Sequence, residues 1–497
     1  MNGALMKAAS RFTIAAAFGL VLGVSSAQAA DLGGNCCADL EERIAELEAT
    51  TARKGNRKVS LTITGQVHRM VLWWDDGKKS DTYYGLDNTN SSTRFTFTGT
   101  AKVTPNVEMG FDITIEVEAG GTSSKVSQFD EDGKVGAQIN GAGAGSFNTG
   151  NTDAYAGDAR RLAWWIEDKR FGRMTVGRYD SAGVITTIDL AGIAAGASAS
   201  VILVNGGFLT RGPAGQYFAL TWGAMGDPSS NQGRTELIRY DSPTFLNGFV
   251  FSASIGEAGD YWGAMLRYAA EFNGVRVAAG FGYEDATDIP TNIGPVPGGQ
   301  AGLAGPANLV DAGEVKAWGG GLSLLHVPSG LFAQGHYMRA NYDDPNPITN
   351  PVTGYWGQVA GHKDSTQWLI QAGITKNWFG FGNTAIFGEY SRNLDWGAGV
   401  GVGRNFSAAN IPGAFNVNGV TDTDMTVWGA GVTQAIDAAA TEMYLNWRHF
   451  SSDVNCTGAV LTNTLGTAQC AGAAGGPSKR LGLEDFDAVI GGARIKF

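Results

Sequence analysis

The residues best suited to catalysis are scattered along the chain. Its five histidines lie far apart in the sequence, at His68, His326, His336, His362 and His449. A catalytic histidine needs a nucleophile and a carboxylate beside it. The sequence contains neither a Gly-x-Ser-x-Gly elbow nor a Gly-x-x-x-x-Gly-Lys-Ser/Thr phosphate loop. We therefore expect no catalytic residue, and predict that these histidines lie on separate strands or loops.

One segment has some of the ligands of a calcium loop. The stretch from Gln128 to Gly133 is rich in carboxylates, but its first position is Gln128 rather than aspartate. The twelfth position, where calcium loops carry a bidentate glutamate, is Ile139. We predict an acidic surface loop, with no metal and no cofactor.

Four cysteines follow the first thirty residues. Cys36 and Cys37 are adjacent, a spacing at which a disulfide is geometrically difficult, and no Cys-x-x-Cys pair or zinc-type cluster is present. Cys456 and Cys470 lie in one Gly/Ala/Thr-rich stretch. In an oxidising compartment, these two are predicted to close a loop by a disulfide.

The start of the chain has the pattern of an export signal. Lys7 and Arg11 precede an apolar stretch, and Ala27-Gln28-Ala29 matches the small-x-small site that signal peptidase cuts. We predict a signal peptide over residues 1–29. Its removal takes away two bases and no acid, which changes the formal charge from −11 to −13. An acidic chain of this kind is not expected to bind nucleic acid.

Residues 30–58 are predicted to form a short periplasmic helical or coiled-coil lead. Its apolar seam has the alternating four- and three-residue spacing of a coiled coil, at Leu40, Ile44, Leu47 and Thr51. About two heptads are too few to associate alone. The segment is therefore either an oligomerisation helix, if something larger brings chains together, or a solvated linker.

From Val59 to the end, the apolar pattern repeats every second residue. Composition fits this pattern: 73 glycines, 14 prolines, 17% charged residues and a mean hydropathy of −0.09. Alternation is clear over Val59–Val67, Val107–Val117 and Ala264–Phe272, and Asn273-Gly274 is a strong hairpin signal. Helical membrane spans would need about 20 consecutive apolar residues each. We predict an all-β fold over residues 59–497.

Short turns alternate with long connections along this region. Long polar or Gly/Pro-rich segments, such as Asp75–Ser92, Ala119–Gly157 and Asp180–Gly233, separate pairs of strands joined by short turns. This asymmetry is typical of transmembrane β-barrels. Counting strands between the connections predicts a transmembrane antiparallel barrel of about sixteen strands, with aromatic residues near the strand ends.

The polar face of the predicted strands carries many ionisable groups. Burying them in a dry core would be costly without partners, whereas a water-filled lumen accepts them. The residues predicted to face the lumen are Asp112, Glu116, Arg267, Arg276 and Arg448. The residues predicted to face lipid are Val107, Phe111, Ile113, Leu266, Tyr268, Val277, Phe281 and Ile374.

Several motifs resemble the general porins of alphaproteobacteria, the rhizobial type. The lead Ala38–Glu48, followed by Arg53–Val59, is similar to the start of those proteins, and Arg239–Pro243 resembles a strand-to-turn motif of Gram-negative porins. The terminal Phe497 is similar to the aromatic that the barrel-assembly machinery binds. The resemblance implies a homotrimer in the outer membrane, in contact with lipid and lipopolysaccharide. Its implied function is passive diffusion of small hydrophilic solutes.

The resemblance also implies that the third external loop narrows the lumen. The Pro-Glu-Phe-Gly-Gly motif of the best-known porins is missing between Asp180 and Gly233, so the constriction must be argued from position. Residues 181–202 are rich in Ala, Gly, Ile and Val and suit packing inside a barrel. The predicted constriction residues are the loop carboxylates Asp180 and Asp189 and the wall bases Arg94, Lys102 and Arg161.

Two other functions remain open on the sequence alone. One is a substrate-specific channel for a sugar or an anion, and the other is a barrel enzyme. Saturable uptake would favour the specific channel, turnover of a lipid or peptide would favour the enzyme, and linear dependence of flux on solute concentration would favour the general porin.

Overall fold

The computed structural model divides the chain into two units, Met1–Arg57 and Lys58–Phe497. The structure describes, all within the second unit, residues 59–118, 121–124, 126–128, 156–183, 188–197, 207–213, 215, 217–226, 234–256, 261–287, 290–292, 309–311, 314–343, 364–396, 414–415, 420–456, 462–463, 466–467 and 479–497. The predicted signal peptide and helical lead, with Leu40, Ile44, Leu47 and Thr51, lie outside the described residues.

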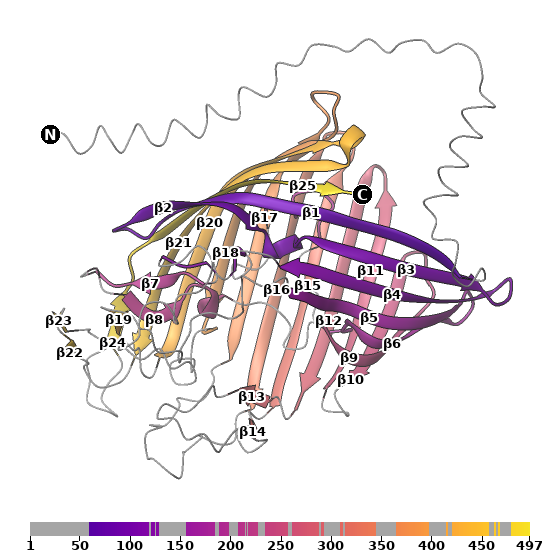
Figure 1. Cartoon of the computed structure of the whole chain (residues 1–497), viewed down its shortest axis with the longest axis horizontal. Helices are drawn as coiled ribbons and strands as arrows, with labels where there is room; N and C mark the ends of the chain where they lie inside the picture. Colours follow the sequence, from indigo (N-terminus) through magenta and orange to yellow (C-terminus); the bar gives the residue numbers. More distant parts are fainter. Residues whose placement is uncertain are drawn as a thin grey trace. The chain divides into compact units, whose positions relative to one another are not determined.

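One large antiparallel sheet contains most of the described residues of the second unit (Figure 1). Its elements are β1 (Ser60–Asp75), β2 (Ser80–Asp87), β3 (Arg94–Lys102), β4 (Val107–Glu118), β5 (Ala156–Asp168), β6 (Gly172–Asp180), β9 (Arg234–Asp241), β10 (Phe249–Gly256), β11 (Tyr261–Phe272), β12 (Val275–Ala286), β15 (Glu314–His326), β16 (Leu331–Asp343), β17 (Ser365–Lys376), β18 (Thr384–Leu394), β20 (Val420–Ile436), β21 (Thr441–Cys456), β24 (Lys479–Gly482) and β25 (Phe486–Lys496).

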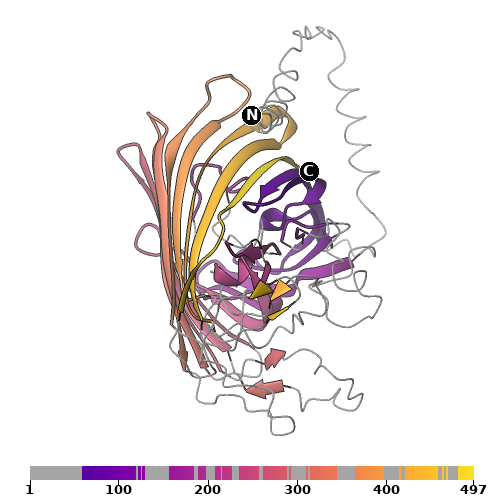
Figure 2. The same cartoon turned by 90° about the vertical axis from the view of Figure 1, so that its left-hand side faces the viewer.

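The sheet closes into a barrel because β1 pairs at both of its edges. On one edge Gln66–Asp75 pairs with β25, and on the other β1 pairs first with β3 and then with β2. β2 and β3 therefore act as two halves of one strand, as do β24 and β25 on β21. Counted in this way, the described residues form sixteen barrel strands, which tilt and curve into a wall (Figure 2). The prediction of a sixteen-stranded antiparallel barrel is confirmed.

Alternation along each strand separates an inner from an outer face. On β1, His68, Leu72 and Trp74 are at most 2% exposed, whereas Ile63 and Val67 are 54% and 44% exposed. Residues directly opposite in an antiparallel ladder point to the same side, so the pairing carries this assignment from strand to strand around the barrel. The outer face is a belt of large apolar side chains, for which lipid is the natural solvent.

Turn chemistry at one end of the barrel matches the sequence. Asn273 and Gly274 have φ values of 48° and 78°, the two positive angles that a type I′ hairpin requires.

One predicted connection is wrong. Residues 75–92 were expected to form a long external loop, but β1 runs to Asp75 and β2 begins at Ser80. The polar Asn and Ser residues that suggested a loop instead form a break between β2 and β3.

Candidate functional site

The described parts of the connection between β6 and β9 contact the inner wall of the barrel. Near its start, the Ala182 N–H donates to Ser254 Oγ of β10 at 2.8 Å. Farther along, the Leu190 N–H donates to Ser323 Oγ of β15 at 3.3 Å. Ser254 and Ser323 are inward-facing wall residues that are almost fully buried. Residues 181–183 and 188–190 of the connection therefore lie against the inner wall.

Apolar packing fixes the middle of this connection. Ile193 is fully buried, and with Ala191 and Ala197 it joins one hydrophobic cluster with wall residues of three strands. Those wall residues are Leu325 of β15, Phe332 of β16, and Ala385 and Phe387 of β18. Residues 188–197, here called the inner segment, are poor in charge because they pack on the wall.

Carboxamide groups hold the other side of the inner segment. Asn88 donates to the Ala195 carbonyl at 3.3 Å, and Asn446 of β21 donates to the Gly196 carbonyl at 2.9 Å. Asn90 donates to the Ala194 carbonyl. A Cβ at Gly196 would lie 2.9 Å from the Tyr444 side chain, so glycine permits this close approach. The inner segment thus crosses from the β15–β18 wall to the β21 wall and the β2–β3 break.

The β2–β3 break is a short 3₁₀ turn, η1 (Thr89–Ser91), that wall residues hold in place. Gln66 Nε2 donates to the Ser91 carbonyl at 2.6 Å, and His68 Nδ1 lies 2.9 Å from the same oxygen. Arg94 and Arg494 each donate to Ser91 Oγ, at 2.9 and 2.8 Å. Sequence analysis missed this turn, although the Asn-Thr-Asn-Ser-Ser run interrupting the alternation marks its position.

Aromatic packing covers the later part of the same connection. Phe208 precedes β7 (Leu209–Arg211), is fully buried, and lies with ring centroids 5.5 Å from Trp74 and 5.0 Å from Phe486. Trp222, between β8 (Tyr217–Thr221) and the 3₁₀ turn η2 (Gly223–Met225), lies 5.9 Å from Phe450. These contacts join the connection to β1, β21 and β25.

The predicted carboxylate Asp189 is part of the inner segment. Its side chain accepts hydrogen bonds from the backbone N–H groups of Ala191, Gly192 and Ala194, at 2.9, 3.0 and 2.8 Å. The carboxylate thus closes its own turn and is not paired with Arg94, Lys102 or Arg161. Its effect on ion flow stays a prediction.

Asp180 and Arg161 are in direct contact. They form an ion pair, and Asp180 also meets Arg234 Nε at 2.8 Å. Arg161 Nη1 lies 3.6 Å from Asp112, and its guanidinium lies 4.9 Å from the centre of the Tyr179 ring. A register shift between Thr114 and Ile115 in the β4–β5 ladder gives Arg160 a neighbouring carboxylate, Glu116, with which it forms an ion pair.

Arginines from four strands gather along this side of the interior. We call this group the basic wall. It consists of Arg94 of β3, Arg160 and Arg161 of β5, Arg234 of β9 and Arg494 of β25. Its carboxylate partners are Asp112, Glu116, Asp180 and Glu442, of which Glu442 lies 2.8 Å from both Arg494 Nε and Lys496 Nζ. Lys102 lies at the far end of β3, exposed and outside this group.

All five residues predicted to face the lumen lie on the inner face. The ladder places Asp112 opposite Thr98 and Glu116 opposite Arg94, on the same side as Gln66. Arg448 is paired with Glu389 at 2.6 Å, and both side chains are nearly fully buried. Arg267 contacts Asp241 at 3.1 Å and Arg276 contacts Glu271 at 2.9 Å. Their effect on conduction stays a prediction.

The remaining predicted groups are not brought together. Cys456 is the last residue of β21 and pairs with Lys479 in the ladder, whereas Cys470 lies outside the described residues, so the disulfide stays a prediction. Within the described ranges, no group of three or more His, Cys, Asp or Glu is placed to hold a metal ion. Over the same ranges, no helix is long and apolar enough to cross a membrane.

The curated proteins contain no match to this sequence. Solved structures that match the chain include OmpT of Vibrio cholerae, with 12% identity, a TM-score of 0.45, and coverage of 89% of this chain and 99% of that chain. An anion-selective porin from Comamonas acidovorans has 14% identity, a TM-score of 0.45, and coverage of 88% and 100%. OmpF of Salmonella typhi has 11% identity, a TM-score of 0.43, and coverage of 88% and 98%.

A family model gives the decisive match. The model described as Gram-negative porin matches residues 13–455, which include most of the barrel. The closed sixteen-stranded barrel, with a charged interior and an apolar outer face, is the architecture that such a family requires. The chain therefore belongs to the Gram-negative porins, the outer-membrane channels for small solutes.

Proposed function

We propose that this porin is a general diffusion channel of the alphaproteobacterial, rhizobial type, in which residues 180–233 narrow the lumen. The observation that supports this proposal is the course of the inner segment. It contacts Ser323 on one wall and Asn446 on another, so it crosses the path that a solute must take. A hydrophilic solute would pass between this segment and the basic wall.

The constriction is proposed to discriminate by charge. Arg94, Arg160 and Arg161 occupy one side, while the inner segment opposite carries Asp189, whose charge is spread over three backbone hydrogen bonds. The electrostatic potential between the two sides is then set mainly by the arginines and their partners, Asp112, Glu116 and Asp180. Fixed charges act most strongly where the water layer is thin.

The test replaces residues 188–197 with ten alternating glycines and serines. The barrel ladders do not include this segment, since β6 pairs directly with β9. We expect the variant to fold to a heat-modifiable barrel and to show a clearly higher single-channel conductance in planar bilayers. Unchanged conductance would show that the segment does not narrow the channel. Uptake into liposomes that saturates at low solute concentration would favour a substrate-specific channel instead.

The assembly is proposed to be a homotrimer in contact with outer-membrane lipid and lipopolysaccharide. The apolar outer belt supports a lipid contact, and the seam from Leu40 to Thr51 supports an association of chains. Phe497 is proposed to be read by the barrel-assembly machinery after export and cleavage near Ala29. No enzymatic activity is proposed, and turnover of a lipid or peptide substrate by the purified barrel would contradict this.

A further inference from the structure

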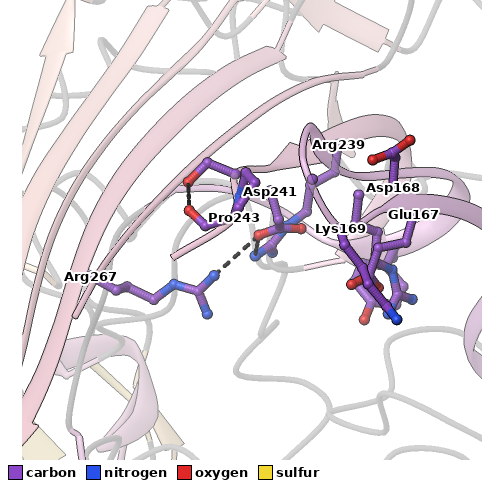
Figure 3. Close-up of a pocket in the computed structure, with 11 residues that line it drawn as sticks. Glu167, Asp168, Lys169, Arg239, Asp241, Pro243 and Arg267 are labelled. Carbon is purple, nitrogen blue, oxygen red and sulfur yellow. Dashed lines mark hydrogen bonds and ion pairs between the residues drawn. The ribbon is translucent and has the colours of Figure 1, made fainter. Parts of the chain in front are cut away.

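A second polar site lies at the end of the barrel where the strands are joined by short turns. A cavity of about 330 Å³ lies there. Figure 3 shows Arg267 extending from one side of it toward Asp241. Its walls come from the inner faces of β5, β6, β9 and β11 and from the turns after β5 and β9. This cavity is separate from the inner segment, none of whose residues line it.

Asp241 is the fixed centre of one side of the cavity. Arg239 binds it through two hydrogen bonds, Nη2 to Oδ1 at 2.7 Å and Nε to Oδ2 at 2.9 Å. Ser252 Oγ donates to it at 2.5 Å. Arg239 alone is enough to balance the charge of Asp241. Arg267, which reaches Asp241 Oδ1 and Ser252 Oγ through the same Nη2 atom at 3.1 Å, therefore adds a positive charge.

Arg173 supplies a second cation on the other side. Its guanidinium lies 4.3 Å from the centre of the Trp165 ring, and its Nε donates to Thr175 Oγ1 at 3.3 Å. The indole holds the guanidinium plane, while the Nη groups remain free to donate. Among the described residues, no carboxylate is within ion-pair distance of Arg173 or of the nearby Lys169, whose Nζ donates to the Pro105 carbonyl at 3.2 Å.

The balance of charge favours an anion. Once Arg239 and Asp241 are set aside as a pair, and Asp168 is assigned to its partner Arg170 at 2.9 Å, three cations remain against Glu167. Guanidinium groups bind carboxylates in a planar, two-bond geometry. The volume lies near the lower end of small-molecule sites, which span about 300–1,000 Å³.

We propose that this cavity is a binding site for small carboxylate solutes on the path through the channel, held mainly by Arg173 and Arg267. The proposal rests on the channel function of the barrel, because the site faces the lumen and is reached by solutes in transit. A bound dicarboxylate adds bulk to the lumen and neutralises positive charge there, so it lowers the current carried by chloride. Flux of small carboxylates would then saturate, whereas flux of neutral solutes would stay linear in solute concentration.

The experiment uses the intact protein in planar bilayers, with succinate as the probe and potassium chloride carrying the current. Succinate should reduce conductance along a saturable curve. Arg173→Gln and Arg267→Gln should each raise the half-inhibiting concentration about tenfold, the effect of losing one charged hydrogen bond. Glu167→Gln should lower that concentration, because it removes the carboxylate that repels the probe.

The matched control is Arg276→Gln. Arg276 is also an inward-facing arginine and is paired with Glu271, but it does not line the cavity. It should leave the half-inhibiting concentration unchanged. An equal loss of inhibition in Arg276→Gln would show a general effect of lumen charge and overturn the site. Inhibition that is unchanged in both cavity variants would also overturn it. Absence of any channel current in the unmodified protein would instead contradict the channel itself.

Discussion

Carboxamide side chains position the inner segment by donating to three consecutive backbone carbonyls. Asn90 donates to Ala194, Asn88 to Ala195 and Asn446 to Gly196. Backbone carbonyls do not depend on side-chain identity, so these bonds fix the course of the segment and leave its surface free to vary. A neutral donor also adds no charge to the lumen. The asparagines thus set the position of the inner segment, whereas the arginines set the electrostatic potential of the lumen.

Asn446→Ala should loosen the inner segment without disturbing the barrel. The substitution removes the 2.9 Å bond to Gly196, and one such bond contributes about 0.5–1.5 kcal/mol. We expect noisier single-channel currents and a higher mean conductance, with little change in the melting temperature of the barrel. Asn393→Ala is the control, because Asn393 faces inward but bonds to Gln367 and Ser391. Equal noise in both variants would argue against the anchoring role.

Arg161→Gln should shift ion selectivity toward cations. It leaves Asp112 without the cation 3.6 Å away, while Asp180 keeps Arg234. The reversal potential in a potassium chloride gradient should move accordingly, and more at low salt, since the screening length is about 10 Å at 0.1 M. Arg170→Gln, which removes a charge that is 62% exposed in a turn, should leave the reversal potential unchanged. A shift of the same size in both variants would contradict this role for the wall.

At the scale of single elements, β11 shows how much the sequence can predict. Its alternation assigns Leu266 to the outer face and Arg267 to the inner face, and the ladder with β12 agrees with both. The same rule could not predict η1, because in a sequence a short turn within a strand cannot be told from a loop. It could not predict the partners of Asp189 either, because the sequence does not distinguish a carboxylate that closes a turn from one that is exposed. The alternating pattern predicts on which face of the sheet a side chain lies, whereas contacts across the interior depend on distances between segments that are far apart in the sequence.

Leu266→Arg and Met265→Arg form a direct test of this sidedness. The two residues are adjacent in the middle of β11, and the ladder directs them to opposite faces. An arginine on the lipid face at mid-bilayer costs about 2–4 kcal/mol, whereas the lumen accepts it at little cost. Unfolding in urea from lipid vesicles should therefore show a large loss for Leu266→Arg and a small one for Met265→Arg. The reverse order would require the opposite assignment of faces.

At the scale of the whole molecule, the stability of the barrel and the association of chains depend on different residues. The described barrel satisfies the hydrogen bonds of its strands by closing on itself, so no strand edge remains to recruit a second chain. Association into the proposed trimer would then rest on side chains of the outer surface or on residues before the barrel. The seam of Leu40, Ile44, Leu47 and Thr51 is the predicted contribution from those residues.

Deleting residues 38–53 should weaken the proposed trimer and spare the barrel. The deletion removes the apolar seam, so the trimer should dissociate at a lower temperature in detergent, while heat-modifiability of the monomer band persists. Replacing Leu40, Ile44 and Leu47 with serine should have the same effect with the chain length unchanged. Trimer melting that is indifferent to both changes would identify the segment as a linker.

Closure between β1 and β25 also has a consequence for synthesis. β1 is the first barrel strand to leave the ribosome, and β25, its partner along Gln66–Asp75, is the last. Until β25 is present, every intermediate has two open edges and an uncovered apolar face, the features that promote aggregation. The nascent chain must therefore be kept apart from other chains throughout translation and export, and the ring can form only after synthesis of the barrel strands is complete.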